Sequence, residues 1–186
     1  MGVRVGPPQR DEGWFTSLYA AEYAHIVRYG LRRLTDGDAA AELAQEVFVV
    51  AWRRRVEVPD RSLPWLYGVA RRLLANQWRS RRAAPDLQPI TDVDLTRLAG
   101  SPGADTTVGV ADVRAALATL NELDQEILRL VGWEELTVSE AAKVLGCTGP
   151  TAAVRLHRAR RRLAEAMADQ PARARRRPML ATREEL

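Results

Sequence analysis

The stretch TVSEAAKVLGCTGPTAAVRLHRARRRL, residues 137–163, decides the fold of the C-terminal part of this chain. Thr137 and Glu140 have the spacing of a capping box, in which each side chain satisfies a free backbone N–H at a helix start. A short helix follows, and Gly146 suits the left-handed residue that ends it. Residues 148–150 then start a second helix. This order of cap, short helix, glycine turn and second helix predicts a helix-turn-helix motif.

The two helices of such a motif have to cross closely, so the residues between them must be small. Ala142, Gly146 and Ala152 have the spacing that this crossing requires. The second helix must also bury one apolar stripe, which is predicted to consist of Ala152, Leu156, Ala159 and Leu163. The opposite stripe of that helix is left free to face another molecule.

That opposite stripe is rich in arginine. The five arginines between Thr148 and Ala164 have no acidic residue among them, so the ion pairs of an ordinary solvated helix are missing. We interpret the stripe as a DNA-binding surface; the alternative is a charged face in contact with water alone. The candidate DNA-binding residues of this motif are Thr148, Thr151, Ala153, Val154, Arg155, His157, Arg158, Arg161 and Arg162.

Composition supports this interpretation mildly. The positive residues are 27 arginines and the single Lys143, and the net charge is +4. Arginine binds phosphate and guanine edges through two hydrogen bonds at once, so arginine runs suit nucleic acid. A GC-rich genome favours arginine as well. The positions of the arginines therefore carry more information than their number.

Other classes of site find no support in the sequence. The single Cys147 cannot form an internal disulfide, and with only His25 and His157 it makes no zinc-ligand set. No nucleophile, base and orienting group are recognisably assembled, and a phosphate-binding glycine loop is missing. No window approaches the length of a membrane-spanning helix, and residues 1–9 lack a secretory signal. We therefore expect a soluble cytoplasmic protein with no enzymatic activity, metal, cofactor or membrane insertion.

Helical periodicity extends outward from the motif. Apolar spacing predicts helices over residues 14–34, 38–54, 64–82, 112–120 and 124–133. Proline, glycine and aspartate interrupt the pattern between residues 84 and 109, which indicates a flexible acidic linker. The predicted class is all-α, with two small helical domains of which the C-terminal one contains the helix-turn-helix. The predicted boundaries are 12–84 and 111–170 for the domains, 85–110 for the linker and 171–186 for a basic disordered tail.

Three blocks of sequence carry a family resemblance. The block LDQEILRLVGWEELTVSEAAKVLGCT (residues 123–148), followed by VRLHRARRRL (154–163), resembles the C-terminal promoter-reading region of the extracytoplasmic-function (ECF) sigma factors. The blocks AELAQEVFVVAW (41–52) and PWLYGVARRLLANQWRSRR (64–82) resemble their polymerase-gripping and promoter-opening helices. The resemblance implies a protein that binds core RNA polymerase, through the β′ clamp helices and the β flap, and directs it to the −35 and −10 elements of promoter DNA.

The second predicted helix, residues 38–54, carries an acidic stripe opposite its apolar face. Counting 100° per residue places Leu43 and Val47 on the core side and the acidic residues on the other. Val49 projects from the acidic stripe, where an apolar side chain gains nothing from water. Ordinary amphipathicity would also explain the stripe, but the resemblance matches it to the surface that meets the polymerase clamp. The candidate polymerase-binding residues are Asp38, Glu42, Gln45, Glu46 and Val49.

Aromatic and arginine side chains interleave on the third predicted helix, residues 64–82. Such a surface stacks extruded bases and neutralises the adjacent phosphates. The alternative is that Tyr67 and Trp78 close the core, which is the place predicted for Trp52 and Trp65. The resemblance also implies base capture by the preceding loop, residues 55–62. The candidate DNA-binding residues of this half are Arg61, Tyr67, Arg71, Arg72, Trp78, Arg79 and Arg82.

The start of the recognition helix departs from the family pattern. Four residues stand where small polar and basic side chains are common: Gly149, Pro150, Ala153 and Val154. Fewer hydrogen bonds to base edges are then available. We therefore expect a weakly specific or shape-led contact with the upstream element that relies on Arg155, Arg158 and phosphate.

Two other functions remain open on the sequence alone. The first is an operator-binding regulator that uses the same motif without joining polymerase. The second is a sigma-like protein that sequesters polymerase or another regulator. Because many members of the resembled family are held inactive by an anti-sigma factor, such a protein is a candidate partner. Cys147 lies in the turn of the motif, where we expect a packing role.

Overall fold

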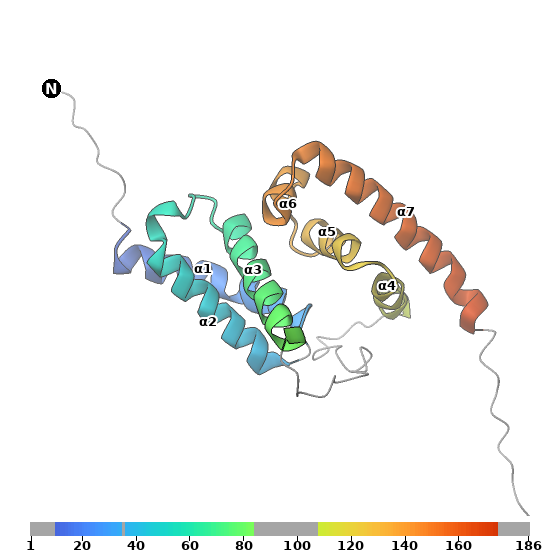
Figure 1. Cartoon of the computed structure of the whole chain (residues 1–186), viewed down its shortest axis with the longest axis horizontal. Helices are drawn as coiled ribbons and strands as arrows, with labels where there is room; N and C mark the ends of the chain where they lie inside the picture. Colours follow the sequence, from blue (N-terminus) through green and yellow to red (C-terminus); the bar gives the residue numbers. More distant parts are fainter. Residues whose placement is uncertain (1–9, 35, 84–107, 175–186) are drawn as a thin grey trace, which may run out of the picture.

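The computed structural model describes residues 10–34, 36–83 and 108–174 (Figure 1). The N-terminal bundle consists of α1 (Glu12–Leu31), α2 (Gly37–Arg53) and α3 (Leu63–Ala83), with the 3-10 turn η1 (Arg55–Glu57) between α2 and α3. The C-terminal bundle consists of α4 (Val108–Ala118), α5 (Glu122–Gly132), α6 (Val138–Leu145) and α7 (Gly149–Ala174). These three ranges contain no strand, and the predicted all-α class is confirmed.

Local sequence signals set the helix starts. Asp11 accepts a hydrogen bond of 3.0 Å from the backbone N–H of Trp14, which caps α1. Asp36 caps α2 in the same way, and Asn121 caps α5 with a bond of 2.9 Å from the N–H of Asp124. Aspartate and asparagine at these positions satisfy backbone donors that the helix itself leaves free. Each start lies within a few residues of the predicted one.

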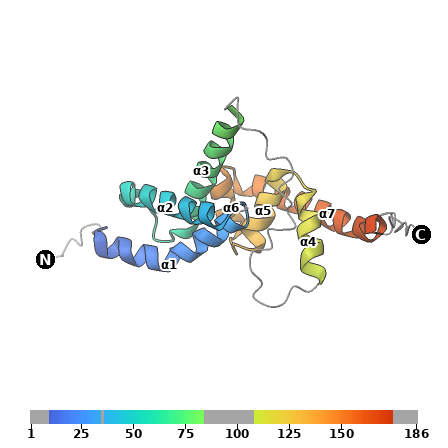
Figure 2. The ribbon, with the colours of Figure 1, turned by 90° about the horizontal axis from the view of Figure 1, so that it is seen from below.

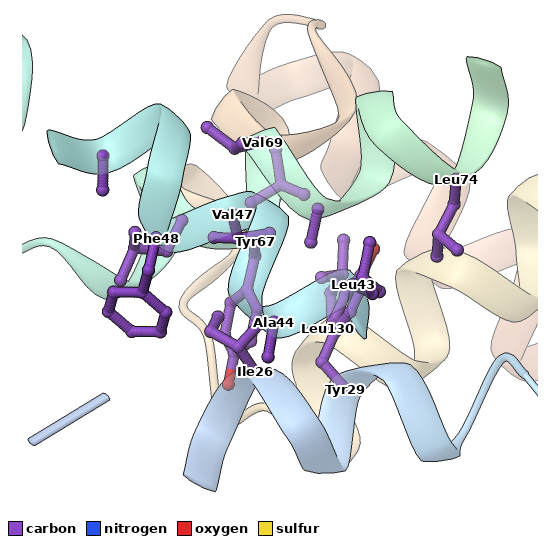
Figure 3. Close-up of a cluster of buried hydrophobic side chains, with 14 of the residues drawn as sticks. Ile26, Tyr29, Leu43, Ala44, Val47, Phe48, Tyr67, Val69, Leu74 and Leu130 are labelled. Atoms are coloured by element: carbon purple, nitrogen blue, oxygen red, sulfur yellow. The ribbon is translucent and has the colours of Figure 1, made fainter. Parts of the chain in front are cut away.

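The N-terminal bundle packs its helices around a shared apolar core. Leu43 and Val47 of α2 lie with Ile26 of α1 in this core (Figure 3). Leu66 of α3 belongs to the same core, and all four are fully buried. α1 and α2 approach closely at Gly30, where an added Cβ would lie 3.0 Å from the Cβ of Ala40 and 3.1 Å from its Cα. A glycine is favoured there because a Cβ would press on the backbone of α2.

The C-terminal bundle contains the predicted helix-turn-helix. α6 and α7 pack through Ala142 and Ala152, which are both buried, and Ile127 of α5 completes this second apolar cluster. Gly146 ends α6 with φ of 68°, in the left-handed region. The predicted roles of the small residues and of the glycine turn are therefore confirmed.

The two bundles are in contact, which the sequence did not indicate. α3 packs against α6, and Leu130, Leu136 and Val144 of the C-terminal bundle belong to the apolar core of the N-terminal one. Figures 1 and 2 show α5 and α6 beside the α1–α3 group, and Figure 3 shows Leu130 among Leu43 and Tyr29. Residues of both bundles thus pack in the first of the two apolar clusters, whereas the second belongs to the C-terminal bundle.

Two helices extend past the predicted domain boundaries. α4 begins at Val108, so residues 108–110 are helical and not part of a linker; one glycine costs a helix only about 1 kcal/mol. α7 continues to Ala174, past the predicted start of the tail at residue 171. The remainder of the predicted linker, residues 84–107, and of the tail, residues 175–186, lies outside the described residues. Among the helices of the described ranges, none has the length and hydropathy to cross a bilayer.

Candidate nucleic-acid and protein interfaces

The helix-turn-helix is held by the capping box that the sequence predicted. The backbone N–H of Thr137 donates to Oε2 of Glu140 at 2.9 Å, and the N–H of Glu140 donates to Oγ1 of Thr137 at 3.3 Å. At the other end of α6, the N–H of Cys147 donates to the carbonyl of Ala142 at 3.0 Å. Cys147 is half-buried against the core of the C-terminal bundle, which agrees with the packing role expected of it. These bonds fix the angle at which α7 leaves the turn.

The exposed side of α7 forms one wall of an open depression of about 510 Å³, and the start of α5 forms the other. Five of the nine predicted DNA-binding residues of this half line it: Thr151, Val154, Arg155, Arg158 and Arg162. The other four are exposed but lie outside the depression: Thr148, Ala153, His157 and Arg161. The structure thus brings three of the predicted arginines together on one concave surface.

The depression also contains residues that sequence reasoning missed. Asn121, Leu123 and Asp124 line its α5 side. Asp124 is buried, accepts a hydrogen bond of 2.8 Å from Nδ2 of Asn121 and forms an ion pair with Arg162. Arg162 is therefore neutralised, whereas Arg155 and Arg158 leave the depression with net positive charge. Asn121 and Asp124 have the spacing of a helix cap, which the sequence shows. No pattern in the sequence indicates that this cap lies beside α7.

The predicted polymerase-binding residues lie on one accessible side of α2. Leu43 and Val47 face the core, as predicted, and Glu46 is half-buried between the two sides. Val49 is 47% exposed, which is high for an apolar side chain on a packed helix. The residues that are exposed on this side are Asp38, Glu42, Gln45 and Val49. This arrangement is the one that a partner helix laid along α2 would require.

Tyr67 does not lie on a DNA-facing surface, and the structure contradicts that prediction. The residue is only 1% exposed, and its ring stacks on that of Tyr29 with centroids 5.0 Å apart. Burial and the nearby carboxylate of Glu134 raise the pKa of Tyr67. The physical reason is that α3 is covered on two sides. α1 and α2 cover one side and α6 covers the other, so more of its circumference is buried than in a helix that packs against a single bundle.

The rest of the predicted surface on α3 is accessible. Trp78 is partly exposed, Arg72 and Arg79 are exposed, and Arg71 is half-buried. Arg72 donates to the carbonyl of Gly68 at 3.0 Å, within its own helix. The side chain of the remaining predicted residue, Arg82, lies outside the described residues. The predicted surface thus keeps its exposed arginines, but Trp78 is the one predicted aromatic side chain that remains on it.

Arg61, predicted to bind DNA, and Trp52 and Trp65, predicted to lie in the core, have surroundings that differ from the predicted ones. Arg61, in the loop between η1 and α3, forms an ion pair with Glu140 of α6, although its own side chain stays largely exposed. Trp52 and Trp65 are half-buried at the edge of the core, where Trp52 packs edge-on against Phe15 with centroids 5.2 Å apart. In the same loop region, Val56 of η1 is strongly exposed.

A buried charge network between the two bundles was not predicted. Arg33, which is 2% exposed, donates to Oε2 of Glu126 at 2.9 Å and to Oε1 of Glu134 at 3.1 Å. Arg32 forms an ion pair with Glu134, and the hydroxyl of Tyr29 donates to Glu126 at 3.0 Å. Partners about 100 residues apart carry no local spacing signal, so one sequence cannot reveal them.

The electrostatics of the network agree with its burial. Burial alone would lower the pKa of Arg33, but Tyr29 and the carboxylates of Glu126 and Glu134 outweigh it, and that pKa is raised. Burial raises the pKa of Tyr29 well above its ordinary range. Arg129, beside the network, has a lowered pKa because of burial and the charge of Arg33. Within the described ranges, no group of three histidine, cysteine or acidic side chains is placed to hold a metal ion.

The chain matches two family descriptions and several curated proteins. Residues 18–84 match "Sigma-70 region 2", and residues 111–163 match "Sigma-70, region 4". The ECF RNA polymerase sigma factor EcfG of Rhodopseudomonas palustris is 31% identical over 133 residues, which cover 69% of this chain and 71% of that protein. The RNA polymerase sigma factor YlaC of Bacillus subtilis is 28% identical over 155 residues, with 81% and 90% covered.

A third relative is much longer than this chain. The probable RNA polymerase sigma factor RfaY of Xanthomonas campestris pv. campestris is 33% identical over 132 residues. The match covers 67% of this chain, and the chain spans about a third (33%) of the length of that relative.

Two solved structures share the fold. The sigma factor RpoE of Bartonella quintana, solved with the anti-sigma factor NepR, has a TM-score of 0.63 and 21% identity over 83% of this chain and 96% of its own. CnrH, solved with the cytosolic domain of CnrY, has a TM-score of 0.61 and 22% identity over 85% and 90%. Together with the family matches and the identity to EcfG, this shows that the chain belongs to the ECF subfamily of the sigma-70 family of RNA polymerase sigma factors.

Proposed function

We propose that this protein binds core RNA polymerase and directs promoter-specific initiation of transcription. Residues 12–84 would bind the polymerase and the −10 element, and residues 111–170 would bind the −35 element. The observation that carries the proposal is that one chain presents both an exposed acidic stripe on α2 and an arginine-lined depression on a helix-turn-helix. A DNA-binding regulator would need the second surface and have no use for the first.

The polymerase-binding role is assigned to the exposed side of α2. Its acidic and amide side chains can accept hydrogen bonds from a basic partner helix, and Val49 supplies an apolar contact at the C-terminal end of the surface. Polar and charged residues beside an apolar contact are typical of a reversible protein interface. In the family, the partner of this helix is the β′ clamp of the polymerase, and the β flap is the partner of the C-terminal part.

The DNA-binding role of α7 follows from charge and shape. Arg155 and Arg158 line the depression. The one acidic residue that lines it, Asp124, forms its ion pair with Arg162, so it does not neutralise these two arginines. Arginines so placed suit phosphate contacts, which give affinity but little base specificity. We assign the remaining exposed residues of the predicted set, including His157 and Arg161, to the rim of the same interface.

α3 offers fewer aromatic side chains on which bases of the −10 element can stack than the sequence suggested. Separating about four base-pair steps costs roughly 6 kcal/mol at about 1.4 kcal/mol per step. Each base captured on an aromatic ring returns about 1–3 kcal/mol. With Tyr67 buried, only Trp78 remains on this face of α3 among the predicted aromatics. The protein therefore holds at most part of the opened strand, and polymerase must contribute the rest of the melting energy.

Run-off transcription with sigma-free core polymerase tests the proposal. We expect discrete transcripts from a promoter that carries this factor's −35 and −10 elements, selected from a library of genomic fragments. If the protein binds such DNA but never yields a transcript with core polymerase, it is an operator-binding regulator. If it binds core polymerase and lowers transcription by other sigma factors without initiating, it is a sequestering protein.

Two further assignments depend on this function. RpoE was solved in complex with the anti-sigma factor NepR, and CnrH in complex with the cytosolic domain of CnrY. An anti-sigma factor is therefore a candidate partner of this chain, to be sought by co-purification from its own host. As a transcription factor for polymerase, the protein would act in the cytoplasm.

A further inference from the structure

The loop between α2 and α3, residues 55–62, is fastened by an arginine from outside it. Nη1 of Arg10 donates to the carbonyl oxygen of Arg55 at 2.6 Å and also to that of Val58. Nη2 of the same guanidinium lies 3.5 Å from Oδ1 of Asp60. Figures 1 and 2 show the start of α1 beside the end of α2 and the turn that follows it. One side chain thus holds three residues of the loop, which are at least 45 positions away in the sequence.

The surroundings of Arg10 keep its guanidinium in place. The guanidinium carbon lies 5.2 Å from the ring centroid of Trp14, in the first turn of α1, and such a contact attracts a cation to the ring face. Trp14 itself is half-buried and packs against the core of the N-terminal bundle. The side chain of Arg10 is only 14% exposed. Because its charge is covered and directed at the loop, Arg10 is poorly placed to bind a phosphate of DNA directly.

The backbone of the loop gains little support from its own hydrogen bonds. The N–H of Val58 donates to the carbonyl of Arg55 at 3.4 Å, which is long for a bond within a turn. At the other end of the loop, Oγ of Ser62 donates to Oε1 of Glu22 in α1 at 3.0 Å. Arg10 holds the first half of the loop, and Glu22 holds its last residue. Both attachments lie on α1 or directly before it, so the loop keeps a fixed position on the N-terminal bundle.

The outer side of the loop is open to another molecule. Val56 is 82% exposed, and the side chains of Asp60 and Arg61 are strongly exposed as well. A site that has to order one backbone residue during binding loses affinity by on the order of tenfold, because the conformational entropy of that residue is lost in the same step. A loop that is already fixed by Arg10 avoids this loss.

We propose that Arg10 is a positioning residue for promoter opening, which holds the 55–62 loop in the shape that receives an unpaired base of the −10 element. Arg10 does not contact the DNA itself. The loop leads directly into α3, where Trp78 and Arg79 of the predicted DNA-binding surface are accessible. This inference rests on the proposed function, in which the family resemblance gives base capture to this loop. It assigns a role to a residue that lies outside both sets of candidate DNA-binding residues.

The first experiment examines the loop without DNA or polymerase. Hydrogen–deuterium exchange of the full chain, read by mass spectrometry, reports on the backbone amides of peptides that cover residues 54–62. We expect Arg10→Ala to raise the exchange rate there by on the order of tenfold and to leave α2 and α5 unchanged. Arg28→Ala is the matched control, because it removes the same charge from the last turn of α1. Wild-type exchange rates in the loop of Arg10→Ala would overturn the proposal.

The second experiment measures binding of the complex with core polymerase to a fluorescent single strand. This strand carries the −10 element of a promoter selected by run-off transcription. We expect Arg10→Ala to lower the affinity for this strand by on the order of tenfold, with unchanged affinity for core polymerase and for duplex DNA of the −35 element. The slope of log K against log salt should stay at the wild-type value, whereas loss of a direct phosphate contact would lower it by about 0.7.

A conservative variant keeps the test decisive if Arg10→Ala folds poorly. Lysine retains the charge and can donate to both carbonyls from one nitrogen, but it lacks the planar guanidinium. Arg10→Lys should therefore recover part of the affinity for the single strand and part of the protection of the loop from exchange. Exchange and affinity that fall together in the two variants, with alanine lower than lysine, would support the positioning role.

The two experiments separate failure of this inference from failure of the proposed function. Faster exchange in the loop with wild-type affinity for the single strand would overturn the role of Arg10 and leave the sigma function intact. A lowered salt slope would overturn it as well, because Arg10 would then bind phosphate directly. Equal losses for the single strand, the −35 duplex and core polymerase would reduce Arg10 to general support of the fold. Absence of any transcript from the wild type would overturn the proposed function and with it the −10 role, and the exchange rates would still show whether Arg10 fixes the loop.

Discussion

Arg61, in the loop before α3, forms an ion pair with Glu140, the third residue of α6. The carboxylate of Glu140 also accepts from the backbone N–H and the hydroxyl of Thr137, at 2.9 and 2.7 Å, so one side chain both starts a helix and joins the two bundles. The two roles differ in strength. Arg61 is 70% exposed, and exposed ion pairs contribute about 0–1 kcal/mol, whereas loss of a helix cap costs about 1 kcal/mol or more.

Replacement of Glu140 by glutamine should reduce stability in a pH-dependent way. Burial alone would raise the pKa of Glu140, but the hydrogen bonds from Thr137 and the charge of Arg61 outweigh burial, and the pKa lies below its ordinary value of 4.5. A carboxylate whose pKa is lower in the folded than in the unfolded protein stabilises the fold at any pH above its pKa in the unfolded protein. This stabilisation is lost as the pH falls through its pKa in the folded protein. Glutamine at this position still completes a capping box, so only the charge is lost. Urea unfolding should therefore show a wild-type advantage below about 1 kcal/mol at pH 7, which shrinks below about pH 4.5.

Arg61→Ala is the matched control for this measurement. It removes the exposed partner and leaves the capping box intact, so the loss at pH 7 should be smaller than that of Glu140→Gln. A Glu140→Gln deficit that stays constant from pH 7 to pH 3 would contradict the role of the ionised carboxylate.

Gly30→Ala should destabilise the N-terminal bundle by about 1–3 kcal/mol, the usual cost of overpacking a core. The added Cβ would lie 3.1 Å from the Cα of Ala40, and a backbone atom cannot move aside as a side-chain tip can. Gly132→Ala is the control, because an added Cβ there meets nothing within 4 Å and alanine favours the helix by about 0.5–1 kcal/mol. Equal unfolding free energies for the two variants would argue against the close approach of α1 and α2.

The features that the sequence predicted correctly are local ones. Thr137, Glu140 and Gly146 act on each other over a few residues, and the periodicity that placed Leu43 and Val47 in the core repeats within one helix. Their physical causes, a free N–H at a helix start and one buried side, depend on near neighbours in the chain. This is why the helices and the turn of the motif could be predicted with small boundary errors.

The features that the sequence could not predict depend on contacts between distant segments. Helical periodicity puts Tyr67 on the side of α3 opposite Leu66 and Val69. The contact of α3 with α6 buries part of that side as well, and Tyr67 with it. The buried ion pairs of Arg33 with Glu126 and Glu134 span about 100 residues, with no periodicity that links them. The pairing of Asp124 with Arg162 is of the same kind, and it removes one arginine from the predicted DNA-binding surface.

Gln45→Arg should abolish binding to core polymerase without changing the helix content. Gln45 is exposed on the acidic side of α2, so a positive charge there disturbs a partner surface and not the core. Like charges brought together at an interface cost several kcal/mol, which corresponds to a loss of at least a hundredfold in affinity. Surface plasmon resonance with immobilised core enzyme would measure the loss. Ala24→Arg, which adds the same charge at an exposed site of α1, should bind normally, and normal binding by Gln45→Arg would exclude this side of α2.

The upstream promoter element should tolerate base changes. Val154 is 51% exposed at the depression, and Ala153 is exposed beside it, and neither can donate a hydrogen bond to a base edge. A mismatch in a directly read site costs about 1–3 kcal/mol. We expect each single base-pair substitution in the upstream element to cost less than about 1 kcal/mol in a competition binding assay. Losses above that value at several positions would show direct readout by residues other than these two.

Arg158→Ala should weaken promoter binding by a similar factor on all sequences and reduce its dependence on salt. Arg158 lies in the depression, where the acidic Asp124 is already paired with Arg162, so its charge is available for phosphate. Loss of one phosphate contact lowers the slope of log K against log salt by about 0.9. Arg160→Ala is the control, because Arg160 is exposed on the same helix but does not line the depression. If Arg158→Ala instead changed base preference with an unchanged salt slope, Arg158 would read base edges, and specificity would have to be assigned to it and not to the shape of the DNA.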